Sequence, residues 1–206
     1  DLVDSCSRRK KNKKEEQRQA ANSTAPQVKI AIIGAGFGGL AMAIRLLQNN
    51  IRDFVILEKA SVIGGTWREN QYPGAACDVQ SHMYSLSFAP KTDWSKRYAE
   101  ADEIFEYIQD ITEQYKLKDY CKFNHEVSHA EFDENRNVWT LEFKDQPTIE
   151  AQFVIFASGP LHVPQIPHLK GIEKFKGKVF HSSQWDHQYS LEGKAVASIG
   201  TGGSAI

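Results

Sequence analysis

Three glycines with a fixed spacing are the first residues in this chain that could take part in chemistry. Gly34, Gly36 and Gly39 fit the pattern G-x-G-x-x-G, and Gly38 lies between the last two. In such a turn the first glycine permits a tight change from strand to helix, the second lets a pyrophosphate approach the backbone, and the third lets the helix pack on the strand. The anion would lie at the N-terminus of the helix, where free N–H groups and the dipole favour negative charge. The spacing therefore predicts a dinucleotide site.

The residues around this turn have the periodicity that such a site needs. The run 28–33 is apolar and β-branched, which is typical of a strand buried on both faces, and residues 40–47 place their apolar side chains on one helix face. A second buried strand, 54–57, completes a β–α–β unit and implies a parallel sheet. Glu58 ends this strand, where its carboxylate can accept hydrogen bonds from a ribose and would repel a 2′-phosphate. The first site therefore favours FAD or NAD over NADP.

A second glycine-rich turn follows another apolar run near the end of the chain. Residues 195–199 are predicted to form a strand. The turn consists of Gly200, Thr201, Gly202, Gly203, Ser204 and Ala205, with alanine as the third small residue. Two dinucleotide-binding turns in one chain predict two dinucleotides, such as FAD and a nicotinamide. Because the sequence ends at Ile206, we expect the second domain to be truncated and the chain by itself to be inactive.

The remaining pattern predicts an α/β, Rossmann-like FAD-binding domain, a doubly wound parallel sheet with a β-hairpin, which leads into a truncated second, NADP-binding Rossmann domain. Further predicted elements are a long functional loop over 60–100, a helix from Ile104 to Tyr115 with Asp102 as N-cap, a hairpin of 127–132 and 138–143, and a buried parallel strand at 153–157. The predicted domains are a disordered basic arm over 1–27, the FAD-binding domain over 28–170, and a linker with the start of the second domain over 171–206.

Composition excludes several classes of function. The 206 residues carry a net charge of -1, so no global charge favours nucleic acid. The basic residues of the arm are Arg8, Arg9, Lys10, Lys11, Lys13, Lys14 and Arg18, a run typical of a solvated segment. No stretch is apolar enough for a transmembrane helix, and no apolar h-region starts the chain. The three cysteines lack metal-ligand spacing, so we expect reduced thiols, no metal site and a cytoplasmic protein.

Two longer motifs carry a family resemblance. The first runs from Gly64 to Trp67 and continues from Tyr72 to Asp78. The second, 175–186, has the form F-x-G-x-x-x-H-x-x-x-W-D. Together they resemble the fingerprints of type I Baeyer–Villiger monooxygenases and related flavin-containing monooxygenases, and the simpler flavin enzymes usually lack the Trp–acid pair. Ala157-Ser158-Gly159 resembles the Ala-Thr-Gly turn of the family. The chain departs from the family pattern at Arg68 and Ala76, where an aromatic residue and an arginine are commoner.

The resemblance implies a reaction that uses FAD, NADPH and dioxygen to convert a ketone to an ester or lactone. Asp78 would lie beside the flavin as the catalytic carboxylate of this chain, where it orients an arginine from outside the chain. The implied FAD contacts are Gly34, Gly36, Gly38, Gly39, Glu58, Gly65, Thr66, Trp67, Asp78, Tyr84 and Val127. The implied nicotinamide contacts are His181, Trp185, Gly200, Thr201, Gly202, Gly203, Ser204 and Ala205. Two alternatives remain, an enzyme that oxygenates amine or sulfide heteroatoms and a non-catalytic nucleotide-binding chain.

Overall fold

The computed structural model describes residues 27–205, so nearly all of the predicted basic arm lies outside the described part of the chain. Its centre is a six-stranded sheet with the order β3-β2-β1-β6-β5-β4. The strands are β1 (Gln27–Ile33), β2 (Phe54–Leu57), β3 (Cys121–Lys122), β4 (Val127–Asp133), β5 (Val138–Phe143) and β6 (Ile149–Phe156). The α-helices are α2 (Phe37–Gln48), α3 (Thr66–Glu69) and α4 (Ala101–Gln114), joined by short 3₁₀ turns.

The three predicted parallel strands are neighbours, as the sequence pattern indicated. β1 pairs in parallel with β2 on one side and with β6 on the other, so that Ile32 lies opposite both Ile56 and Ile155. The predicted hairpin is also present, because β4 and β5 pair antiparallel from Val127 to Phe143. The glycine turn at 34–39 therefore lies at the carboxyl end of the central strand, where ligands bind in open α/β sheets.

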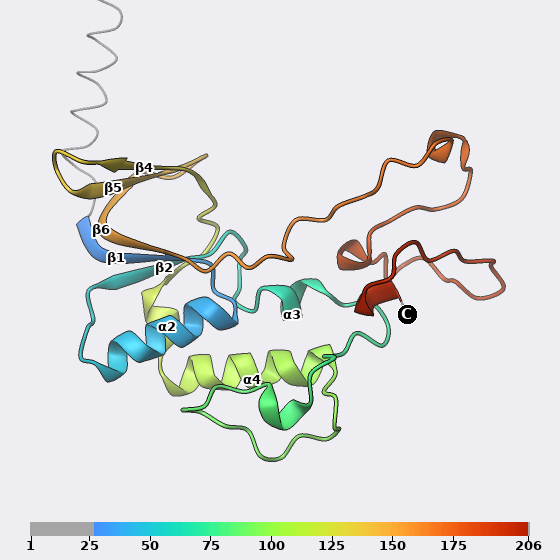
Figure 1. Ribbon diagram of the computed structural model, residues 1–206, viewed down its shortest axis with the longest axis horizontal. Coiled ribbons are helices and arrows are strands. Elements are labelled where there is room, and N and C mark those ends of the chain that lie inside the picture. The colour runs from blue at the N-terminus through green and yellow to red at the C-terminus, as the bar shows by residue number, and fades with distance from the viewer. Residues whose placement is uncertain (1–26, 206) are drawn as a thin grey trace, which may run out of the picture.

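The two faces of the sheet are covered by different kinds of element. Alternate side chains such as Ile30, Ile32 and Ile56 pack in one core with α2 and α4. The residues between them, such as Ala31 and Val55, belong to a second core with side chains of the β4–β5 hairpin. Figure 1 shows the hairpin above the central strands and both helices below them. The predicted α/β Rossmann-like class is confirmed, and the hairpin covers the second face in place of helices.

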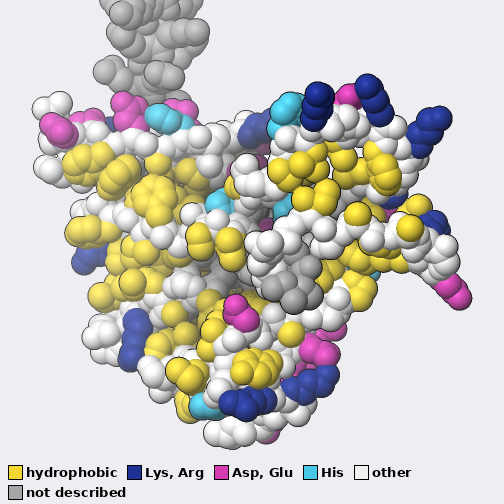
Figure 2. All heavy atoms as spheres, turned by 45° about the vertical axis from the view of Figure 1, so that its right-hand side comes forward, with side chains coloured by type: hydrophobic (Ala, Val, Ile, Leu, Met, Phe, Trp, Pro, Cys, Tyr) yellow, Lys and Arg dark blue, Asp and Glu magenta, His cyan; other side chains and the backbone are white. Residues whose placement is uncertain are grey.

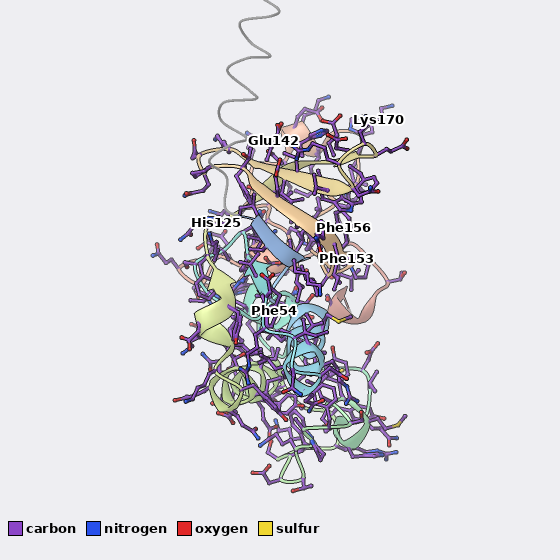
Figure 3. All side chains as sticks on the ribbon, turned by 90° about the vertical axis from the view of Figure 1, so that its left-hand side faces the viewer. Phe54, His125, Glu142, Phe153, Phe156 and Lys170 are labelled. Carbon is purple, nitrogen blue, oxygen red and sulfur yellow. The ribbon has the colours of Figure 1, made fainter. Side chains whose placement is uncertain are left out.

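β6 has one unpaired edge in the described chain. Its first residues, 149–151, pair with β5, whereas 152–156 pair with β1 alone. Phe153 and Phe156 lie on this stretch with 57% and 61% of their surface exposed, so the prediction of a fully buried strand at 153–157 is wrong for these two side chains. Figure 3 labels both rings on the side of the sheet away from His125. The faces of a strand are buried only where other elements cover them, and neither ring belongs to the core beneath the helices or to the core beneath the hairpin, which explains the difference.

Two local predictions are corrected by the structure. Helix α4 starts at Ala101 with Glu100 as N-cap, so Asp102 lies within the first turn, where its charge favours the dipole but caps nothing. Residues 195–199 form no strand, and Val196 and Ile199 are 62% and 63% exposed. A strand needs a neighbouring strand for its backbone groups, and no strand of the described sheet pairs with this run.

The long segment 60–100 is ordered by backbone hydrogen bonds and contains α3 and a 3₁₀ turn. Cys77 N–H donates to the Ala99 carbonyl at 2.9 Å and Ala101 N–H to the Ala75 carbonyl at 2.8 Å, which ties the second half of the first fingerprint to the start of α4. None of the helices within 27–205 is both long and apolar enough to cross a membrane.

Candidate functional site

The glycine turn is too tight to accept a side chain at two of its positions. Gly34 has a φ of +106°, and a Cβ there would lie 2.6 Å from the carbonyl oxygen of Ala157. A Cβ on Gly39 would lie 1.9 Å from the carbonyl oxygen of Gly34, because the helix starts directly against the turn. The Gly34 N–H donates to the Leu57 carbonyl at 2.8 Å and fixes the turn to β2. The third glycine of the motif therefore serves close packing of helix on strand, as predicted.

The N-terminus of α2 is free to receive an anion. Its N-cap is Gly36, which has no side chain to satisfy the first N–H groups, and the first turn contains no acidic residue. The nearest atom to a Cβ on Gly36 would be the Cα of Gly65 at 3.7 Å, so the two glycine motifs meet backbone to backbone. Exposed helix N–H groups with glycine on both sides fit the pyrophosphate of a dinucleotide.

Glu58 lies at the end of β2 with 4% of its surface exposed. Its Oε2 accepts from the Ala35 N–H at 2.8 Å, inside the glycine turn, and its Oε1 accepts from the Ala60 N–H at 2.9 Å. Arg68 contributes a third donor, with Nη1 3.3 Å from Oε1. The predicted ribose-binding carboxylate is thus held against the turn that would bind the phosphates.

Aromatic side chains from three segments meet beside the turn. The Trp67 indole N–H donates to the Tyr84 hydroxyl at 3.1 Å, and the two rings pack edge to face at 5.6 Å. Phe37, in the first turn of α2, packs on Tyr84 at 5.2 Å. Burial raises the pKa of the Tyr84 phenol, an effect that the Trp67 hydrogen bond opposes and the nearby Cys77 and Asp78 reinforce. The structure therefore brings Trp67 and Tyr84, both predicted cofactor contacts, to the same side of α2.

Asp78 is exposed, and within residues 27–205 its carboxylate accepts no hydrogen bond. It is close enough to Cys77 to add to the rise that burial causes in the pKa of that thiol. If Asp78 only capped the loop, its carboxylate would accept a hydrogen bond from a nearby N–H group, and none of the described hydrogen bonds supplies one. The carboxylate is free to receive a cation.

A loop that sequence reasoning missed lies against Glu58, the predicted ribose-binding residue. The His125 N–H donates to the Glu58 carbonyl at 2.9 Å and the Asn124 N–H to the Ala60 carbonyl at 2.9 Å. Asn124 has a φ of +56°, a conformation that asparagine tolerates better than most residues. The loop leads into Val127, a half-buried residue at the start of β4 that was predicted to contact the cofactor. Its Asn-His sequence alone carried no signal of this position.

The second set of predicted contacts lies in the extended segment after β6, at the right of Figure 1. The His181 Nδ1 accepts from the Ser183 N–H at 3.2 Å, and the Trp185 ring packs on Phe180 at 5.1 Å. These contacts stay inside the fingerprint segment. Between the turn at 200–205 and the first fingerprint, the Tyr72 hydroxyl donates a hydrogen bond to the Ser204 Oγ at 2.8 Å.

Figure 2 shows apolar side chains across one face of the molecule, with several Lys and Arg side chains gathered at the upper right. The C-terminal segment contributes many of these apolar groups. The exposed large apolar residues between β6 and residue 200 are Leu161, Val163, Ile166, Phe175, Val179, Val196 and Ile199. The structure thus leaves the predicted nicotinamide segment without a core of its own.

The described cysteines are free thiols. Cys77 is buried, and burial raises the pKa of the Cys121 thiol to about 11. Thiols with a raised pKa carry little thiolate near neutral pH and react slowly. Among residues 27–205 no cluster of three or more His, Cys, Asp and Glu side chains could hold a metal ion.

The sequence of this chain is similar to a known protein family and to known monooxygenases. Residues 31–206 match the family described as pyridine nucleotide-disulphide oxidoreductase. A Baeyer–Villiger monooxygenase of Streptomyces coelicolor is 46% identical over 179 residues, which cover 87% of this chain and 34% of that protein. A Baeyer–Villiger monooxygenase of Pseudomonas aeruginosa is 47% identical over 188 residues, which cover 91% of this chain and 36% of that protein. The chain thus spans about a third of the length of these relatives.

Solved structures give the same relationship. The ε-caprolactone-bound crystal structure of cyclohexanone monooxygenase superimposes with a TM-score of 0.80 at 34% identity, over 87% of this chain and 36% of that one. A steroid monooxygenase bound to NADP superimposes with a TM-score of 0.71 at 32% identity, over 79% of this chain and 32% of that one.

Proposed function

We propose that this chain, which belongs to the pyridine nucleotide-disulphide oxidoreductase family, is the FAD-binding part of an FAD- and NADPH-dependent Baeyer–Villiger monooxygenase. One observation carries the proposal. The Gly34–Gly39 turn lies at the carboxyl end of the central strand, and the buried Glu58 carboxylate accepts a hydrogen bond from inside it. Phosphate donors and a ribose acceptor are therefore adjacent, as a dinucleotide requires.

The residues of this chain would bind and orient the cofactor. The N–H groups at the start of α2 would hold the pyrophosphate, and Glu58 would accept from the ribose. Bound FAD would supply the redox chemistry that links the oxidation of NADPH to the reduction of dioxygen. The packed rings of Trp67 and Tyr84 would exclude water from one side of the site. The similarity to Baeyer–Villiger enzymes supports a ketone as substrate and an ester or lactone as product.

The second nucleotide would be NADPH, at the turn formed by residues 200–205. We assign residues 28–170 to the FAD-binding domain and 171–206 to a linker and the start of the NADP-binding domain, with His181 and Trp185 in the linker. We propose that they couple the two domains; their described contacts order the 175–186 fingerprint itself. The disulphide part of the family description finds no counterpart in the described cysteines, both of which are free. We further propose a cytoplasmic location.

Direct binding tests the proposal. Incubated with FAD and passed through a desalting column, the 206-residue chain should retain flavin absorbance, and ADP-ribose should compete for the site. FMN should not compete, because the contacts described at Gly34–Gly39 and Glu58 suit the adenosine half and the pyrophosphate. A chain that retains no flavin, or that retains FMN as well as FAD, would contradict the assignment.

Asp78 has a separate expected role in a protein long enough to complete the catalytic centre. Asp78→Ala should slow ketone-dependent NADPH oxidation at least about tenfold while changing FAD affinity less than about twofold, because an oriented cation acts mainly on the transition state. Asp78→Asn, which keeps the shape and removes the charge, should behave like the alanine variant. Wild-type turnover in both variants would show that the carboxylate has no part in the reaction.

A further inference from the structure

The Arg68 guanidinium forms hydrogen bonds with acceptors from three different residues. Its Nη1 lies 3.3 Å from Glu58 Oε1 and 2.7 Å from the Val62 carbonyl oxygen, and its Nη2 lies 2.7 Å from Glu69 Oε1. The side chain is 14% exposed. Three acceptors therefore hold the guanidinium in one position. Such a planar group matches carboxylate and carbonyl oxygens in a way that lysine does not.

The position of Arg68 is itself tied to the nucleotide turn. The Arg68 N–H donates to the Gly65 carbonyl at 3.1 Å, and Gly65 abuts Gly36, since a Cβ on Gly65 would lie 3.1 Å from the Gly36 Cα. Gly64 is equally constrained, because a Cβ there would lie 2.9 Å from the Arg68 Cβ. The guanidinium is therefore placed by the same glycines that bring the first fingerprint against the Gly34–Gly39 turn.

The effect of this placement falls on the Glu58 carboxylate. Oε1 accepts from both the Ala60 N–H and Arg68, whereas among the described residues Oε2 accepts from the Ala35 N–H alone. A carboxylate oxygen has about two lone-pair positions. Oε1 is thus saturated, and Oε2 keeps a position for a ligand hydroxyl. Arg68 orients the carboxylate and decides which oxygen remains available.

Charge leads to the same conclusion. Glu58 is almost fully buried, and a buried carboxylate without a cation is strongly disfavoured. A pyrophosphate at the start of α2 would bring more negative charge to the same end of the sheet. Lys59 belongs to the same group of charges through its contact with Glu69 at 3.6 Å, but its side chain is 40% exposed and its described ion pair is with Glu69, not with the Glu58 carboxylate. Arg68 is therefore the cation that balances Glu58 beside an anionic ligand.

We infer that Arg68 is a positioning residue of the first dinucleotide site, which fixes and neutralises Glu58 so that Oε2 receives a ribose hydroxyl. The inference rests on the proposed function for the identity of the ligand. It assigns a role to the residue at which the chain departs from the aromatic position of the first fingerprint. It also predicts that Arg68 acts on the ligand only through Glu58.

Affinity for FAD, measured by titration of the purified chain, tests this role. Arg68→Gln should raise the dissociation constant at least about tenfold, because breaking a buried ion pair leaves a charge uncompensated. Arg68→Lys should recover part of the loss. Lys59→Gln removes the same charge from the same group of residues without touching Glu58, and its dissociation constant should stay within about twofold of the wild type.

Coupling between the two residues distinguishes positioning from a general loss of structure. Glu58→Gln/Arg68→Gln should bind FAD no more weakly than Glu58→Gln alone, since Arg68 has nothing left to position. Wild-type affinity in Arg68→Gln, or losses that simply add in the double variant, would overturn the inference.

The wild type, Glu58→Gln, Arg68→Gln and the double variant, melted without ligand, provide a readout that does not depend on FAD. Arg68→Gln should lower the melting temperature, and the double variant should recover part of it, because the buried charge is gone. If the wild-type chain binds no FAD, the proposed function fails, and the ligand-free cycle still decides whether Arg68 and Glu58 are coupled. Additive changes in melting temperature would show that Arg68 and Glu58 are not coupled and would overturn the inference.

Discussion

Replacing Gly39 with alanine should destabilise the domain by about 3 kcal/mol or more and abolish FAD binding, because overpacking against backbone cannot be relieved by a rotamer change. A Cβ at this position would lie 1.9 Å from the Gly34 carbonyl oxygen and 3.4 Å from the Ile32 Cγ2. The only relief is to move α2 away from β1, which opens the turn that would hold the phosphates. Chemical denaturation followed by circular dichroism measures the stability, and flavin retention measures the site.

Gly38 provides the matched control. It lies one residue earlier in the same helix, and a Cβ there would lie 3.8 Å from the Ala157 Cβ, an ordinary contact. Gly38→Ala should therefore leave the fold intact and could stabilise it by up to about 1 kcal/mol through helix propensity. Equal losses in the two variants would show that general sensitivity of the turn, and not the contact of helix with strand, accounts for the effect.

Glu58→Arg should lower FAD affinity more than about a hundredfold, the second large effect that we expect. The substitution removes the acceptor of the Ala35 and Ala60 N–H groups and places a second guanidinium against Arg68. Both consequences are costly in a buried position, since unpaired polar groups and like charges are each unfavourable there. The measurement is flavin absorbance retained after desalting, with circular dichroism as a check on folding.

Asp53→Arg is the control for the charge change. Asp53 is exposed and immediately precedes β2 at the end opposite to Glu58, so the net charge changes equally while the glycine turn is untouched. This variant should bind FAD like the wild type. If Glu58→Arg retains its flavin absorbance, the ribose does not contact Glu58 and the site lies elsewhere.

The core of the fold was predictable because its signals are local. Residues 28–57 contain a strand, a glycine turn, a helix and a second strand, and each is specified by its own periodicity and turn chemistry. The hairpin at 127–143 was predictable for the same reason. The exposure of Phe153 and Phe156 was not, because burial of side chains on a strand depends on which elements cover its two faces, and the apolar run 153–157 says nothing about those elements. The strand predicted from the apolar run at 195–199 was wrong for a similar reason, since the run does not say whether another strand lies beside it.

The site was predictable only in part. The glycines and Glu58 are identified by spacing, since the turn fixes where the next strand must end. The ion pair of Arg68 with Glu58 joins a residue of α3 to the residue that follows β2, and its geometry depends on the meeting of Gly65 with Gly36. The loop at Asn124 and His125 reaches Glu58 only because β3 pairs beside β2. Contacts of this kind follow from tertiary packing, which a single sequence pattern does not encode.

The strand order has a consequence for how the protein must be made. β1 leaves the ribosome before the other strands of the described sheet, yet one of its two partners, β6, is complete only at Phe156. Until then the central strand can pair only with β2, and its other edge and its two apolar faces have no complete cover. Pairing across so long a sequence separation is slow, because loop closure costs entropy before any contact repays it. The nascent chain must therefore carry a half-built sheet from the synthesis of β1 until β6 emerges, and its yield in a cell should depend on chaperones that shield β1.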